Sequence, residues 1–155
     1  MERSIQDTLR QDHARLRAVL ERLDALLRRR ARGVAADPPD APRTLALELA
    51  ARLGAHLTVE ADAETLLVSS LDRNASTRGA VTALRGEHEE QRSMLATLVR
   101  TLDFPPGARR DEQVAVQLRD LVDLVRIHVR KEDVLILAAA QAAQQPHPRR
   151  KGNTP

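Results

Sequence analysis

Residues 9–27 read LRQDHARLRAVLERLDALL, and this stretch contains the repeat that decides the fold. Its leucines recur at spacings of three, four and seven residues, so they line one side of an α-helix. They are Leu9, Leu16, Leu20, Leu23 and Leu27. Because a helix with one apolar side buries that side against other elements, the stretch predicts an amphipathic helix, which we expect over residues 3–32.

Three further stretches show the same pattern, and we expect helices over residues 42–71, 76–103 and 110–145. Gly33 and three prolines end the first helix, Ser76 is the expected N-cap of the third, and Pro105-Pro106-Gly107 separates the last two. Long helices joined by short connections favour an antiparallel, up-down-up-down four-helix bundle. We therefore predict one domain over residues 1–145, followed by a disordered, basic tail over residues 146–155.

The composition agrees with an all-α fold. Phe104 is the only aromatic residue of the 155, and 30% of the residues are charged. Sheets prefer aromatic and β-branched residues, whereas leucine, alanine and arginine are good helix formers. The chain has no cysteine, which excludes disulfides, zinc–thiolate sites and thiol chemistry.

The charge pattern and the absence of long apolar runs limit the possible partners and location. No stretch has the apolar core of a signal peptide or the roughly 18 apolar residues of a membrane span, so we expect a cytoplasmic protein without a membrane partner. The net charge is +3, and the arginines at positions 28–30 and 32 lie where a helix C-terminus favours cations. No recognised nucleic-acid motif accompanies them. We expect no nucleic-acid partner, and a monomer or weak homodimer.

The histidines carry the functional signal. His147 lies in the predicted tail, but the other four fall on four different predicted helices, each in register with the apolar side: His13, His56, His88 and His128. Their distances from the connecting loops agree to within a few ångströms at 1.5 Å per residue. One histidine in a core is usually structural, but four at one level predict a shared site.

Two glutamates belong to the same pattern. His56 and Glu60 are four residues apart, as are His128 and Glu132, so both glutamates point to the side of the helix that carries the histidine. Burying two unpaired carboxylates costs several kcal/mol each. An arginine partner, protonation or a metal ion would relieve that cost. Imidazole together with carboxylate suits iron, or alternatively manganese.

On the basis of these histidines and glutamates, the sequence resembles the hemerythrin family, and most closely its bacterial HHE cation-binding branch. The segment Gln11-Asp12-His13-Ala14-Arg15-Leu16 is similar to the opening segment of that family. The resemblance implies two non-haem iron ions with an oxo or hydroxo bridge between them. It implies one ion held by His13 and His56, the other by His88 and His128, and bridging carboxylates from Glu60 and Glu132.

The chain departs from the family pattern at several positions. Arg92 stands where oxygen-carrying members have a further histidine. Members of the family often have an aromatic residue and a proline after the motifs of the second and fourth helices, whereas residues 66–68 and 135–137 of this chain contain neither.

Either Glu132 or Asp133 could supply the bridging carboxylate of the fourth helix. We favour Glu132, four residues after His128, because a residue five positions after His128 points about 140° away from the histidine around the helix. Glu64 is either an additional ligand or a solvated residue. We expect Glu87, next to His88, to be a surface charge, and Arg92 to contact a bridging carboxylate or to extend along the surface. A site without the further histidine has more exchangeable positions, which fits reaction with oxygen, nitric oxide or peroxide.

Several functions remain open at this stage. Ferritin-like di-iron bundles use Glu-x-x-His pairs, which the sequence lacks, and it has neither a nucleophile elbow nor a phosphate-binding loop. Within the hemerythrin-like interpretation, the first hypothesis is a di-iron protein that binds or reacts with oxygen, nitric oxide or peroxide, or that senses oxygen, nitric oxide or iron. The second is an enzyme that disproportionates peroxide, as a catalase does, or detoxifies nitric oxide. The third is a metal-free structural bundle.

Overall fold

The computed structural model describes residues 5–34, 37–71 and 75–144, and the side chains of residues 7–34, 37–60 and 79–138. These residues form four α-helices: α1 (Ile5–Ala31), α2 (Ala41–Leu71), α3 (Ala75–Leu102) and α4 (Ala108–Gln144). The all-α prediction is confirmed, and each helix lies within a few residues of its expected range. Ser76 is already inside α3, so its expected role as the N-cap is wrong. The predicted tail lies outside the described residues.

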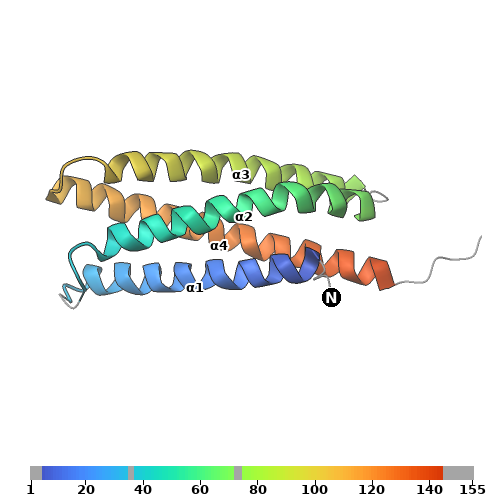
Figure 1. Ribbon diagram of the computed structural model, residues 1–155, viewed down its shortest axis with the longest axis horizontal. Helices are drawn as coiled ribbons and strands as arrows, with labels where there is room; N and C mark the ends of the chain where they lie inside the picture. The colour runs from blue at the N-terminus through green and yellow to red at the C-terminus, as the bar shows by residue number, and fades with distance from the viewer. Residues whose placement is uncertain (1–4, 35–36, 72–74, 145–155) are drawn as a thin grey trace, which may run out of the picture.

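Successive helices run in opposite directions, so the chain makes an antiparallel up-down-up-down bundle (Figure 1). α1 packs against α2 and α4, and α3 packs against the same two helices, with a further contact between α2 and α4. The α1–α2 and α3–α4 connections lie together at one end of the bundle (Figure 1). This arrangement brings residues from all four helices to one level, where the predicted site lies.

Local sequence explains where the helices end. Gly33 has a φ of 70°, in the left-handed region, and its N–H donates to the carbonyl of Arg30. The N–H of Val34 donates to the carbonyl of Arg29, which completes a Schellman motif that terminates α1. At the same end of the bundle as Gly33, Pro105 and Pro106 prevent α3 from continuing towards α4 (Figure 1).

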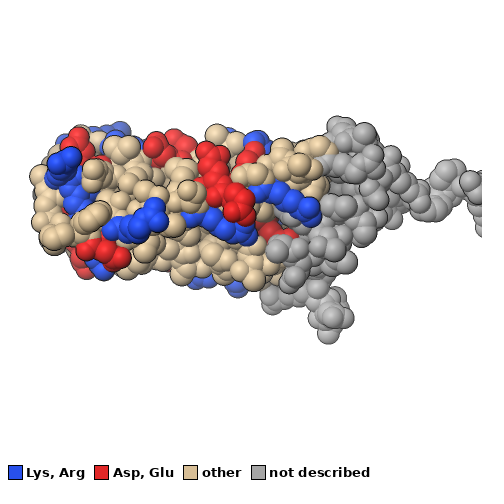
Figure 2. Space-filling model, turned by 90° about the horizontal axis from the view of Figure 1, so that it is seen from above, with Lys and Arg blue, Asp and Glu red and all other residues tan. Residues whose placement is uncertain are grey.

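The predicted apolar sides form the core. Leucines from α1 and α2 and valines from α4 are almost completely buried there, among them Leu16, Leu20, Leu53 and Val125. The face seen from above carries interspersed basic and acidic side chains (Figure 2). None of the helices, as far as the chain is described, is long and apolar enough to cross a membrane.

Candidate metal centre

The four histidines and two glutamates lie together inside the bundle. The side chains of His13, His56 and His128 have no exposed surface, and His88, Glu60 and Glu132 are at most 5% exposed. α1 contributes His13, α3 contributes His88, and α2 and α4 each contribute a histidine and the glutamate one turn further along. The expected convergence of six side chains from four helices is therefore present in the structure.

The six side chains are arranged in two successive layers along the bundle. The imidazoles form one layer, in which the rings of His13 and His56 are 5.1 Å apart and those of His88 and His128 are 4.6 Å apart. Because α2 and α4 run in the same direction, Glu60 and Glu132 both lie one turn beyond the imidazoles on the same side. The carboxylates thus approach all four rings from one direction.

The Nε2 atoms of the histidines face the carboxylate oxygens. Nε2 of His13 lies 3.1 Å from Glu132, and Nε2 of His88 lies 2.8 Å from Glu60. His56 Nε2 lies 3.3 Å from Glu60 and 3.4 Å from Glu132, so it contacts both carboxylates. His128 Nε2 lies 3.1 Å from Glu132 and 2.9 Å from Nε2 of His88. Each glutamate therefore touches histidines from more than one helix.

Three of the imidazoles are oriented by a second carboxylate on the outward-facing ring nitrogen. Nδ1 of His13 donates to Asp133 at 2.8 Å and Nδ1 of His56 donates to Asp12 at 2.7 Å. Nδ1 of His128 donates to Glu87 at 2.9 Å. An ionised carboxylate can only accept a hydrogen bond, so Nδ1 carries the proton in each of these rings. The Nε2 lone pairs are consequently directed into the cluster.

Two of these outer carboxylates are paired with a cation in turn. Arg17 of α1 binds Asp133, and Lys131 of α4 binds Glu87. Burial raises the pKa of Glu87, but its bonds with Lys131 and His128 outweigh burial and lower that pKa overall. Glu87 therefore stays ionised and keeps its role as an acceptor. These contacts also join α1 to α4 and α3 to α4 around the site.

The inner groups favour the protonation states that bind a cation. Burial lowers the pKa of His13, against the hydrogen bond to Asp133, so this ring is neutral at neutral pH. Burial alone would raise the pKa of Glu60, but its contacts with His128 and His88, and the positive charge that the nearby imidazoles carry at low pH, lower it to about 2. A neutral imidazole and an ionised carboxylate are the forms in which these side chains coordinate metal ions.

The residues present fit a bound metal. Four inward-facing atoms are buried without a hydrogen-bond partner: Nε2 of His13 and of His56, and one oxygen of each of Glu60 and Glu132. Buried polar atoms are rarely left in this state. For bonds of about 2.1 Å, neighbouring ligand atoms of an octahedral ion are about 3.0 Å apart, which is close to the 3.1–3.4 Å separations between these nitrogens and oxygens.

The donors divide into two groups of four that could each hold one ion. The first group is His13, His56, Glu60 and Glu132, and the second is Glu60, His88, His128 and Glu132. In each group the ligand atoms all lie within 4.8 Å of one another. Both glutamates belong to both groups, whereas each histidine belongs to one. This sharing is the arrangement expected of two neighbouring ions linked by carboxylates.

The structure separates the alternatives that the sequence left open on α4 and α3. Glu132 lies in the cluster, whereas Asp133 lies outside it and accepts a hydrogen bond from Nδ1 of His13. Arg92 does not contact a bridging carboxylate: its side chain lies at the surface, the other expectation for it, and donates to Glu89 on its own helix at 2.6 Å. The side chain of Glu64 lies outside the described residues.

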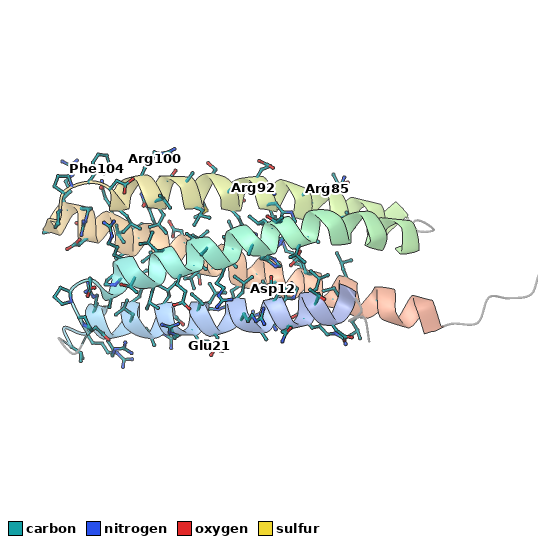
Figure 3. The ribbon with its side chains drawn as sticks, viewed as in Figure 1. Asp12, Glu21, Arg85, Arg92, Arg100 and Phe104 are labelled. Carbon is teal, nitrogen blue, oxygen red and sulfur yellow. The ribbon has the colours of Figure 1, made fainter. Side chains whose placement is uncertain are left out.

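Sequence reasoning missed the outer carboxylates, and the expectation that Glu87 is a surface charge is wrong. A signal for them does exist. Asp12 precedes His13, Glu87 precedes His88 and Asp133 follows Glu132, and each of them binds a histidine on a neighbouring helix. Adjacent residues on a helix differ by about 100°, so a neighbour of an inward-pointing ligand faces the next helix. In Figure 3, Asp12 lies on the inner side of α1, whereas Glu21 lies on its outer side.

The seam between α2 and α3 contains a surface groove. It has a volume of about 450 Å³ and is lined by residues next to the histidines in sequence, including Leu57 of α2 and Arg92 of α3. A Cβ atom at Gly54, which also lines the groove, would meet nothing within 4 Å. Leu57 is only 3% exposed.

A helical bundle with buried imidazoles and carboxylates in its core defines a class, that of four-helix cation-binding proteins. Comparison with known families then gives the particular member of this class. The chain belongs to the hemerythrin HHE cation binding domain family, whose pattern matches residues 4–140. The resemblance seen in the sequence is thereby confirmed. No curated protein and no solved structure matches the chain.

Proposed function

We propose that the chain binds two iron ions, one in each of the two donor groups, and that the pair binds or reacts with oxygen, nitric oxide or peroxide. The observation that carries this proposal is the sharing of Glu60 and Glu132 between two otherwise separate histidine pairs. A single ion would need only one such group. Iron is favoured because imidazole and carboxylate ligands together suit it, with manganese as the alternative.

The chain's own residues would hold the ions and leave room for a small molecule. His13 and His56 would bind one ion, His88 and His128 the other, and the two glutamates would bridge them. Each group offers four protein atoms, whereas iron commonly accepts six ligands, so positions remain for exchangeable molecules. When bound, the iron pair supplies redox chemistry with small oxygen and nitrogen species. The surrounding leucines exclude bulk water, and Asp12, Glu87 and Asp133 fix the imidazoles.

An anaerobic titration with ferrous iron tests the proposal. We expect uptake to end near two ions per chain, one for each donor group. Exposure of the loaded protein to oxygen, nitric oxide and peroxide in separate experiments should then change its absorption between roughly 320 and 400 nm. The chain has no Trp and no Tyr, so these bands would be largely unmasked. Uptake of one ion, or a spectrum that none of the three molecules changes, would contradict the proposal.

A peroxide-disproportionating, catalase-like enzyme is the second candidate function. It is favoured by Arg92, which stands at the surface and pairs with Glu89, so this position supplies no further imidazole to the cluster. Oxygen evolution from peroxide by the loaded protein, at a rate far above that of free iron, would support the enzyme. Stoichiometric oxidation without turnover would favour a binding or sensing protein.

A further inference from the structure

Gln91 is a fully buried polar residue that the proposed site does not use. Its side chain has no exposed surface, and neither its amide nitrogen nor its carbonyl oxygen has a hydrogen-bond partner. A buried amide without partners destabilises the folded protein relative to a satisfied one. The core of a leucine-rich bundle would accept an apolar residue here at no such cost, so the amide calls for a specific explanation.

The position of Gln91 on α3 directs it to the bundle axis beside the imidazoles. It follows His88 by three residues, which places it one turn further along α3 on the same side of the helix. Leu84 and Leu98, buried on that side, lie about 40° and 80° around the helix from His88, and Gln91 lies about 60° from it in the same sense. Gln91 therefore points between the directions of these two core leucines.

The layer that contains Gln91 lies on the opposite side of the imidazoles from the glutamates. α3 runs against α2 and α4, so a step forward along α3 corresponds to a step backward along those helices (Figure 1). On the other helices, the residues at that level are three positions from a histidine: Leu16 after His13, and Leu53 and Val125 before His56 and His128. All three are fully buried. Gln91 is the one polar member of this four-residue layer, and it faces the side of the imidazoles that no bridging carboxylate covers.

We propose that the Gln91 carboxamide binds the small molecule that enters the open side of the metal centre, with its N–H2 group as donor and its carbonyl as acceptor. This inference rests on the proposed function. Coordination of an ion by the carbonyl would leave the N–H2 group unsatisfied, whereas one molecule that both accepts and donates satisfies the whole amide. Water, hydroxide and hydrogen peroxide have this chemistry, so Gln91 would favour protonated oxygen species at the centre.

Azide, which accepts hydrogen bonds and binds exposed metal ions, is a suitable probe. In the iron-loaded protein, Gln91→Leu removes the donor, and we expect azide affinity to fall about tenfold, the usual effect of losing one hydrogen bond to a charged group. The iron content should stay at the wild-type level. Gln117→Leu is the matched control, because its carbonyl oxygen is also buried without a partner but lies on α4 about 16 Å along the helix from His128. It should leave azide affinity unchanged.

The metal-free protein gives a second, independent readout. Removal of an unsatisfied buried amide should raise the melting temperature of metal-free Gln91→Leu by a few degrees. Gln91→Met is a control for the shape of leucine, because methionine is unbranched like glutamine. Its melting temperature should also increase. A lower melting temperature in both variants would show that the amide has a structural partner, and would overturn the inference.

The remaining outcomes separate this inference from the proposed function. If the wild-type protein loads iron and binds azide but Gln91→Leu binds azide equally well, the inference is overturned and the proposed function stands. If Gln91→Leu holds less iron than the wild type, the amide is a metal ligand and the inference is again overturned. If the wild-type protein takes up no metal, the proposed function is overturned and the inference with it.

Discussion

Glu87 and Glu89 are two residues apart on α3, and their surroundings differ sharply. The Glu87 side chain is 17% exposed and accepts from His128, whereas that of Glu89 is 76% exposed and pairs with Arg92. Outer carboxylates of this kind hold a metal-binding imidazole in the correct tautomer and orientation. The two glutamates therefore make a matched pair for testing whether the outer contacts matter.

Glu87→Ala should weaken iron binding about 10- to 100-fold, the usual effect of removing such a partner. Glu89→Ala should leave iron affinity unchanged, because an exposed ion pair contributes little. Competition with a chelator of known affinity measures both constants. Equal affinities in the two variants would show that the His128–Glu87 contact does not orient a ligand.

His13 makes the stability of the metal-free protein depend on pH. Burial lowers the pKa of His13 in the folded protein, so below pH 6.5 the unfolded chain takes up a proton that the folded chain does not. The free energy of unfolding is therefore highest above that pH. It decreases as pH falls, with His13 contributing at most about 1.4 kcal/mol per pH unit. Urea unfolding of metal-free wild type and His13→Gln between pH 7.5 and 5.5 should give a steeper dependence for the wild type. Parallel curves would contradict the inferred burial effect.

Glu60 adds a further loss of stability at lower pH. Its pKa is about 2 in the folded protein against 4.5 for the free side chain, so its stabilising contribution is present above pH 4.5 and disappears as pH falls towards 2. The histidine and glutamate effects thus have the same direction. Acid should weaken the metal-free bundle in two successive stages.

At the level of single helices, the effect of a glycine on stability depends on its position. Glycine is favoured just after the C-terminus of a helix and disfavoured in the interior. Gly33 has a φ of 70° and closes α1, whereas Gly86 lies inside α3 with open space where a Cβ would stand. Gly33→Ala should destabilise the protein by about 1–2 kcal/mol, because an L-residue is strained in the left-handed region. Gly86→Ala should stabilise it by about 0.5–1 kcal/mol through helix propensity. Thermal melting of both variants checks the signs, and a shared sign would contradict the assignment of Gly33 to a Schellman cap.

The helices and their inward-facing histidines were predictable because the 3.6-residue period fixes which residues share a side of a helix. His13 lies four residues from Leu9 and three from Leu16, so its direction follows from theirs. The N-cap of α3 was less predictable, because helix ends depend on a few local hydrogen bonds. The partner of Asp133 was not predictable by this reasoning, since it depends on how far α4 is rotated against α1. The buried, unpartnered amide of Gln91 likewise required the packed structure.

At the scale of the whole molecule, the metal centre should contribute to the stability of the bundle. The six candidate ligands come from all four helices, and the outer contacts join α1 to α2, α1 to α4 and α3 to α4. A ligand that binds only the folded state raises stability by about 4 kcal/mol at a concentration a thousand times its dissociation constant. We therefore expect bound iron to raise the melting temperature by roughly 10 °C, at 2–4 °C per kcal/mol.

His56→Ala should abolish most of that increase, because it removes a donor that contacts both glutamates. His147→Ala is the matched control, since this histidine belongs to the predicted tail and lies outside the described residues. The measurement is the melting temperature of each variant with and without iron. An iron-dependent increase of wild-type size in His56→Ala would show that the ions bind elsewhere.

We propose that imidazoles and carboxylates from four helices share a pair of metal ions. Metal analysis of the protein purified from iron-supplemented cells, per mole of chain, is the decisive test of this proposal. We expect close to two iron ions per chain, one for each donor group. A value well below one per chain, with no other first-row metal in its place, would contradict it.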